Sequence, residues 1–220
     1  MPAFRLYPLS FKDMPRVRVH QHVNPLAPYF RFAPKPLEIE KVFANPFLPL
    51  HLDIGSARGR FLLKMAETKK NQNFLGVEIR EPLVEEANRI AKEKNSTNLH
   101  YEFCNATLAL DKLLENLPAN LLQTVSIQFP DPWYKKKHAK RRIIKDNLAA
   151  TIVAHLKSAG KIFVQTDVKF LADEMFAVFR ANVNLSEIEI NENPFPVKTE
   201  REMAVEEKGL PIYRMIFEKK

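Results

Sequence analysis

The chain has 220 residues, 45% of them hydrophobic, and a formal net charge of +8 at pH 7. This length suits one sizeable core without requiring two, and the excess of Lys and Arg is compatible with nucleic acid or anionic lipid as a partner. The sequence shows no apolar run of bilayer length, no signal-peptide segment, no ligand-like histidine pairs and a single cysteine, Cys104, so we expect no membrane span, no metal centre and no internal disulfide.

These features predict a cytoplasmic protein, or one housed in a compartment after removal of a transit peptide. Cys104 lies in an apolar segment and is interpreted as a core thiol rather than a nucleophile.

Residues 1–48 are rich in proline, aromatic residues and arginine. Six prolines between residues 25 and 49 disfavour long regular elements. We expect an irregular basic arm that packs partly on the core, followed by one folded domain over residues 49–220. A disordered tail is the alternative, which the Phe and Tyr content of the segment disfavours.

From Pro49 onward, strand-like and helix-like segments alternate. We expect strands at 50–55, 73–79, 99–104, 121–129 and 161–166, and helices at 58–70, 81–94, 108–116, 139–157 and 169–181. This alternation predicts an α/β fold, with a parallel sheet covered by helices on both faces. The tail departs from it, because Ser186–Ile190 and Ile212–Phe217 are strand candidates with no convincing helix between them. They are expected to pair as an antiparallel ribbon at the sheet edge.

The turn after the first predicted strand contains small residues at Gly55, Ala57 and Gly59. Small residues allow a sharp turn and let backbone N–H groups approach a ligand closely. The spacing Gly-x-Ala-x-Gly differs from the Gly-x-Gly-x-x-Gly of dinucleotide sites, which disfavours a nicotinamide dehydrogenase. Asp53, two positions ahead of the first glycine, can receive a cationic amine, which a pyrophosphate ligand does not offer.

Polar side chains also follow the next three strands. Glu78 ends the second strand, where a carboxylate can accept both hydroxyls of a ribose, and Asn105 and Asp131 follow the third and fourth. Because the carboxyl ends of parallel strands meet at one edge, these side chains and Asp53 are expected around one crevice. The combination favours a nucleoside that carries an amino-acid tail. Taken singly, Asp53 could only cap the following helix, and Glu78 could be an exposed strand-end charge.

Asp131 lies between two prolines and shortly before a cationic run. Each proline fixes its own φ and drives the preceding residue toward extended geometry, so the carboxylate is held in place. The run from Lys135 to Arg142 leads into the predicted helix at 139–157, where cations oppose the helix macrodipole. Cations in this position, next to Trp133, favour a docked polyanion over a solvated surface.

Together these motifs resemble the tRNA (guanine-N7-)-methyltransferase family. The resemblance runs from about His51 to Arg214 and is carried by Asp53-Ile-Gly-Ser-Ala-Arg-Gly59, Gly76-Val-Glu78, Asn105-Ala106, Phe129-Pro-Asp-Pro-Trp133 with its basic run, and Thr166-Asp167. It implies a Rossmann-like class I methyltransferase fold with a seven-stranded, mostly parallel sheet. It also implies the donor S-adenosyl-L-methionine and, as substrate, a guanosine in the variable loop of tRNA. Ala57 stands where the family usually has glycine, a change that a negative φ would accommodate.

The resemblance implies roles for individual residues. Asp131 is the expected catalytic carboxylate, and Lys135 and Asp167 are expected to contact the substrate. Thr199 and Glu202 resemble the family's Thr-x-x-Glu motif, which also reaches the substrate. The spacing from Glu202 to Gly209 is longer than the family pattern predicts, and a polar loop before the final strand is the alternative interpretation. The expected donor-binding positions are Asp53, Gly55, Gly59, Glu78, Asn105, Ala106 and Asp131, and the RNA-contacting positions are Lys137, His138, Lys140, Arg141 and Arg142.

The chemistry suits these residues, because guanine N7 carries an in-plane lone pair and needs no general base to attack a sulfonium methyl. Catalysis is expected from in-line positioning and from a carboxylate, Asp131 or Asp167, that stabilises the charge arising on the ring. Two alternatives stay open. The first is an RNA methyltransferase that acts on an exocyclic amine, because Asp-Pro-Trp loosely resembles the loop of such enzymes. The second is a non-catalytic RNA-binding module. The sequence also leaves open whether the protein is a monomer or a homodimer.

Overall fold

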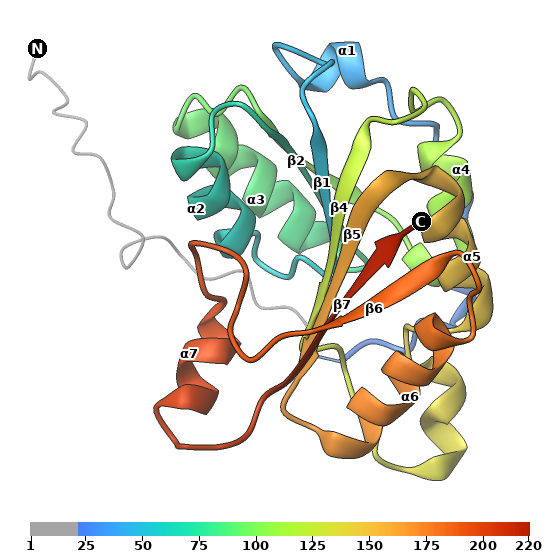
Figure 1. Ribbon diagram of the computed structural model, residues 1–220. Coiled ribbons are helices and arrows are strands. Elements are labelled where there is room, and N and C mark those ends of the chain that lie inside the picture. The colour runs from blue at the N-terminus through green and yellow to red at the C-terminus, as the bar shows by residue number, and fades with distance from the viewer. Residues whose placement is uncertain (1–21) are drawn as a thin grey trace, which may run out of the picture.

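The computed structural model describes residues 22–220, so Arg16, Arg18 and His20 of the predicted arm lie outside the described residues. Its centre is a seven-stranded sheet in the order β3-β2-β1-β4-β5-β7-β6 (Figure 1). The strands are β1 Leu50–Ile54, β2 Asn73–Glu78, β3 Leu99–Phe103, β4 Leu122–Gln128, β5 Leu156–Thr166, β6 Leu185–Glu189 and β7 Tyr213–Lys219. Strands β1 to β5 run parallel, whereas β7 is antiparallel to both β5 and β6. The predicted α/β fold with an antiparallel C-terminal edge is confirmed.

Helices cover both faces of this sheet (Figure 1). One face carries α2 Arg60–Thr68 and α3 Glu81–Glu93, and the other carries α4 Ala106–Leu114, α5 Asp146–His155 and α6 Lys169–Arg180. Every residue of β1 and β2 is buried, as expected of parallel strands that are covered on both sides.

Hydrophobic spacing explains the covering helices, as α3 illustrates. Its buried side chains Leu83, Ala87 and Ile90 recur every three or four residues, while Glu85 and Arg89 are exposed. One face of the helix is therefore apolar and packs on the sheet.

Residues 22–48 lie against the domain. Leu37, Ile39 and Phe43 are buried in the larger hydrophobic cluster, on the side of α4 and α5. The segment also contains a 3-10 turn, Pro28–Phe30, and the short helix α1, Ile39–Val42. The domain boundary at residue 48 stays a prediction.

The predicted helix at 139–157 is wrong at both ends. The basic run forms a 3-10 turn, Lys136–Arg141, and α5 begins only at Asp146, whose carboxylate suits the helix dipole. The cations therefore do not oppose a helix macrodipole. Arg142 has extended backbone, with ψ 142°, which separates the turn from the helix. At the other end, Leu156 already pairs with β4, so β5 begins there.

The segment between the last two strands contains a helix that was not expected. α7 spans Glu200–Glu206, and Thr199 caps it, because its Oγ1 accepts a hydrogen bond from the Glu202 N–H at 3.1 Å. Thr-x-x-Glu is also a helix-start pattern, so a signal for α7 was present. Strands β6 and β7 pair as the predicted antiparallel ribbon.

Candidate active site

A cavity of about 850 Å³ lies at the carboxyl ends of strands β1 to β5. This volume is typical of small-molecule and cofactor sites. The predicted positions that line it are Asp53, Gly55, Glu78, Asn105, Ala106, Asp131, Arg141, Asp167 and Thr199. Gly59, Lys135, Glu202 and the RNA-contacting positions other than Arg141 lie outside the lining. The four strand-end side chains thus meet around one cavity, as their spacing indicated.

The turn after β1 presents its backbone to the cavity. Gly55 has φ +85°, and a Cβ added there would meet no atom within 4 Å, so the backbone borders open space. Gly59 has φ +72°, and a Cβ there would lie 2.5 Å from the Tyr101 ring, which only glycine avoids. Ala57 also has a left-handed φ of 50°, so the negative φ that would accommodate alanine in place of glycine is not found. Its N–H donates to Glu78 Oε2 at 2.9 Å, a bond that holds the turn in this conformation.

Asp53 is buried at the end of β1, with 5% of its surface exposed. Its Oδ1 accepts hydrogen bonds from Ser126 Oγ at 2.5 Å and from Gln128 Nε2 at 3.4 Å. Burial raises the pKa of Asp53 to about 6, although the two hydrogen bonds lower it. A cation bound beside this carboxylate would reduce the cost of the buried charge.

His51 fixes the position of the Ser126 hydroxyl that bonds to Asp53. Its Nε2 lies 2.8 Å from Ser126 Oγ, and because the Ser126 proton goes to Asp53, Nε2–H is the donor. Burial lowers the pKa of His51 to about 3, so the ring stays neutral at physiological pH. The result is a fixed chain of hydrogen bonds that ends at the Asp53 carboxylate.

Glu78 ends β2 and is 3% exposed. The backbone N–H groups of Ala57, Ile79 and Arg80 donate to its carboxylate at 2.9 to 3.0 Å, which fixes its orientation. The Arg80 guanidinium adds a bidentate ion pair, Nε to Oε1 and Nη2 to Oε2, both at 2.9 Å. Because a carboxylate offers about four lone-pair sites, a ligand that bonds to Glu78 would have to replace the bonds from the Arg80 side chain.

His22, Val23 and Pro25 of the arm line the cavity, a contact that sequence reasoning missed. Asn105 Nδ2 donates to the carbonyl oxygens of Pro25 at 2.9 Å and Phe30 at 3.3 Å. His22 Nδ1 lies 2.8 Å from Asp131 Oδ1, although the two residues are 109 positions apart. No local pattern in the sequence could have indicated these pairs.

The loop that carries Asp131 is strained at both ends. Phe129 has φ 49° and Trp133 has φ 44°, conformations that cost large side chains about 1–3 kcal/mol each. Arg142 holds the loop, because its Nε donates to the Pro132 carbonyl at 2.9 Å and its Nη2 to the Trp133 carbonyl at 3.1 Å. Arg142 Nη1 also donates to Glu174 Oε1 of α6 at 2.5 Å. Strain next to a placed carboxylate is typical of functional loops.

The basic run divides into inward and outward cations. The Arg142 side chain is 11% exposed and supports the loop, and its contact with RNA stays a prediction. Arg141 lines the cavity, with its guanidinium 4.9 Å from the centre of the Trp133 ring. Partial burial and the neighbouring charge of Arg141 lower the pKa of His138, so its ring is neutral at pH 7. The exposed cations are Lys135, Lys136, Lys137 and Lys140.

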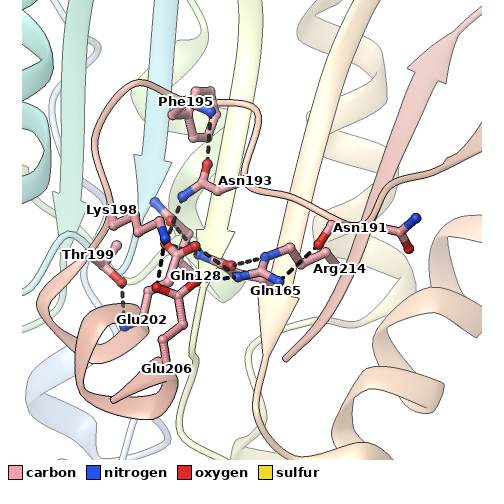
Figure 2. Close-up of polar contacts among 10 residues, drawn as sticks. All are labelled: Gln128, Gln165, Asn191, Asn193, Phe195, Lys198, Thr199, Glu202, Glu206 and Arg214. Carbon is pink, nitrogen blue, oxygen red and sulfur yellow. Dashed lines mark hydrogen bonds and ion pairs between the residues drawn. The ribbon is translucent and has the colours of Figure 1, made fainter. Parts of the chain in front are cut away.

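The opposite rim of the cavity comes from α7 and the residue before it. Thr199 and Arg201 line the cavity, and Arg201 forms an ion pair with Asp167 at the end of β5. Glu202 is fully buried, and its carboxylate is bonded to Arg214 instead of lining the cavity (Figure 2). Thr199 and Asp167 thus line the cavity whereas Glu202 does not, and the contact of Glu202 with the substrate stays a prediction.

Among residues 22–220, no three His, Cys, Asp or Glu side chains are grouped closely enough to bind a metal ion. None of the helices in this part of the chain has the length and hydropathy of a membrane span. Cys104 is 1% exposed, and burial raises its pKa to about 12, so it is a core thiol as predicted.

Comparisons with known proteins place this geometry in context. A family model described as "Putative methyltransferase" matches residues 48–215. The chain is 50% identical over 210 residues to the tRNA (guanine-N(7)-)-methyltransferase of Trichormus variabilis, covering 94% of this chain and 98% of that protein. It is 50% identical over 207 residues to the protein of the same name from Synechococcus elongatus, covering 93% and 97%. The crystal structure of the antibiotic-resistance methyltransferase Kmr matches with a TM-score of 0.53 at 13% identity, covering 83% of this chain and 92% of that one, a likeness of fold alone.

Proposed function

The chain belongs to the tRNA (guanine-N7-)-methyltransferase family, and we propose that it transfers a methyl group from S-adenosylmethionine to N7 of a guanosine in the tRNA variable loop. The observation that carries the proposal is the cavity where Asp53, Glu78 and Asp131 meet at three strand ends. It combines a carboxylate for a cationic amine, a carboxylate for a ribose and a carboxylate in a strained, supported loop.

The cavity residues fit S-adenosylmethionine. Its amino group would form an ion pair with the buried carboxylate of Asp53. Its ribose hydroxyls would take the place of the Arg80 guanidinium at the Glu78 carboxylate. The open space at Gly55 would let the ligand approach the backbone closely. When bound, this donor supplies a sulfonium methyl group and is left as a neutral thioether.

Asp131 is proposed as the catalytic carboxylate. Guanine N7 needs no deprotonation, so the residues of the site act by placement and by charge. As the N7–methyl bond forms and the sulfur–methyl bond breaks, the guanine ring becomes positive, and the Asp131 carboxylate stabilises that charge. His22 contacts Asp131 Oδ1 at 2.8 Å, so base binding competes with the arm for this oxygen. Asp167 and Thr199, on the opposite rim, are the proposed contacts to the base.

Exposed cations beside the cavity would bind the tRNA backbone. Lys135, Lys137 and Lys140 are exposed, and Arg141 of the same basic run lines the cavity. Each lysine that neutralises a phosphate releases condensed counterions, which makes the affinity salt-dependent. Trp133, which also lines the cavity, offers a ring on which a base can stack.

A tRNA transcript made with 7-deazaguanosine tests the proposal, because it keeps the exocyclic amine of guanine but lacks N7. Labelled methyl should enter the ordinary transcript and not the 7-deaza transcript, while both bind the protein equally in a filter assay. Methylation of both transcripts would indicate an exocyclic amine as the acceptor. Methylation of neither would indicate a non-catalytic RNA-binding module.

A further inference from the structure

A row of polar side chains crosses the sheet beside the cavity. Gln128, Gln165 and Arg214 are aligned in register on β4, β5 and β7, and paired residues on neighbouring strands share a face. On that face Gln165 and Arg214 contact Glu202 of α7 (Figure 2). Gln165 Nε2 donates to Gln128 Oε1 at 2.8 Å, and Gln128 Nε2 donates to Asp53 Oδ1 at 3.4 Å. The row therefore begins at Asp53, the proposed binding residue for the amino group of S-adenosylmethionine.

Three side-chain donors hold the Glu202 carboxylate (Figure 2). Arg214 Nη2 donates to Oε1 at 3.0 Å, and Gln165 Nε2 donates to Oε2 at 3.1 Å. Asn193 Nδ2 also donates to Oε2, at 2.7 Å. Arg214 Nε donates to Gln165 Oε1 at 3.2 Å, so the guanidinium and the amide orient each other. Both oxygens of the carboxylate are thus fixed from the sheet.

A buried ion pair is a costly way to attach a helix, because well-packed apolar residues often provide equal stability. α7 has two buried side chains, Glu202 and Val205. An apolar contact such as that of Val205 tolerates sliding, whereas the bonds to Glu202 are directional. The ion pair therefore defines where α7 lies, and not only whether it is attached.

The placement of α7 matters because it forms the rim of the cavity. Thr199 and Arg201 flank the helix start and line the cavity, and Arg201 pairs with Asp167. Asp167 follows Gln165 by two positions at the end of β5. This strand end therefore contacts α7 twice, through the bond of Gln165 to Glu202 and through the ion pair of Asp167 with Arg201. A shift of Glu202 would move the rim relative to β5.

We propose that Arg214 and Gln165 are positioning residues for methyl transfer, because they hold Glu202 and with it the rim that faces the methyl acceptor. This inference rests on the proposed function, since the acceptor is taken to be a guanosine in tRNA. It assigns the Glu202 carboxylate to support of α7 and leaves contact with the base to Thr199 and Asp167.

Hydrogen–deuterium exchange of the α7 amides, without donor or RNA, measures the support directly. Arg214→Met removes the guanidinium but keeps an unbranched side chain. Lys198→Ala is the matched control, because Lys198 pairs with the exposed Glu206 of the same helix at 2.7 Å, and its removal leaves the bonds of Arg214 to Glu202 and Glu206 in place. Exchange in α7 should rise at least about tenfold in Arg214→Met and stay at the wild-type rate in Lys198→Ala, with α2 unchanged in both.

Kinetics test the consequence for catalysis. At saturating donor, kcat/KM for tRNA should fall roughly a hundredfold in Arg214→Met, the usual effect of a misplacement of about 1 Å, while the donor Kd stays unchanged. Unchanged exchange in α7, or unchanged kcat/KM despite faster exchange, would overturn the inference. If Arg214→Met does not fold, Arg214→Lys makes the same comparison, because lysine lacks the planar fork whose two nitrogens bond Glu202 and Gln165 in Arg214. Failure of the proposed function is distinct, since the wild-type protein would then methylate no tRNA whatever the exchange of α7.

Discussion

Replacement of Asp53 by Asn should make the free protein more stable at neutral pH. Burial raises the pKa of Asp53 from an ordinary 3.8 to about 6. Between these pH values the folded chain binds more protons than the unfolded chain, so stability falls as the pH rises through this window. The ionised carboxylate therefore destabilises the fold by about 3 kcal/mol above pH 6, a cost that is absent below the unfolded pKa. Asn avoids the cost and still accepts the hydrogen bond from Ser126.

Urea unfolding of both proteins without donor, in steps from about pH 4 to about pH 8, measures this cost. Asp53→Asn should exceed the wild type by up to about 3 kcal/mol at the upper end, and the gain should shrink toward zero at the lower end. Ser126→Ala is the companion variant, because loss of its hydrogen bond raises the pKa of Asp53 further and moves the window to higher pH. A gain that is independent of pH, or a variant less stable than the wild type at neutral pH, would refute the reasoning.

The same carboxylate should make donor binding pH-dependent. Below about pH 6 a proton competes with the donor amine for Asp53, so calorimetry should show the affinity of the wild type falling with pH. Asp53→Asn should bind the donor weakly at every pH in this range. A donor affinity of the wild type that does not change with pH would exclude Asp53 as the residue that binds the donor amine.

Three further substitutions test single roles. Glu78→Gln should weaken donor binding at least tenfold and leave tRNA affinity unchanged, because each charge-assisted bond to the ribose contributes about 1.5–3 kcal/mol; unaltered donor affinity in calorimetry would exclude the ribose role. Asp131→Asn should bind tRNA normally and methylate slowly at saturating donor and tRNA, and normal turnover would make the carboxylate structural. Lys137→Ala should lower the slope of log affinity against log salt by nearly one. His138→Gln, which replaces a neutral ring, should leave the slope unchanged. Equal slopes for the two variants would show that the basic run is only a solvated surface.

Local patterns were sufficient for the sheet and for the acids around the cavity. The alternation of Val125 and Ile127 marks β4 as a strand, and both residues are buried. Asp53, Glu78 and Asp131 were recognisable because parallel strands must end at the same edge, so position along the chain predicts position in space.

Tertiary contacts overrode local patterns elsewhere. Ile144 and Leu156 continue a helical spacing, yet Ile144 is buried outside α5 and Leu156 joins the sheet. The contact of His22 with the site and the burial of Glu202 by Arg214 join segments that no spacing rule relates. These are the features that only the assembled fold shows.

Mass spectrometry of nucleosides from tRNA incubated with the protein and S-adenosylmethionine is the most direct test of the proposed activity. N7-methylguanosine should be the one new methylated nucleoside, and it should come from fragments that contain the variable loop. A methyl group on an exocyclic amine, or donor bound without any methylated nucleoside across a full tRNA pool, would contradict the proposal.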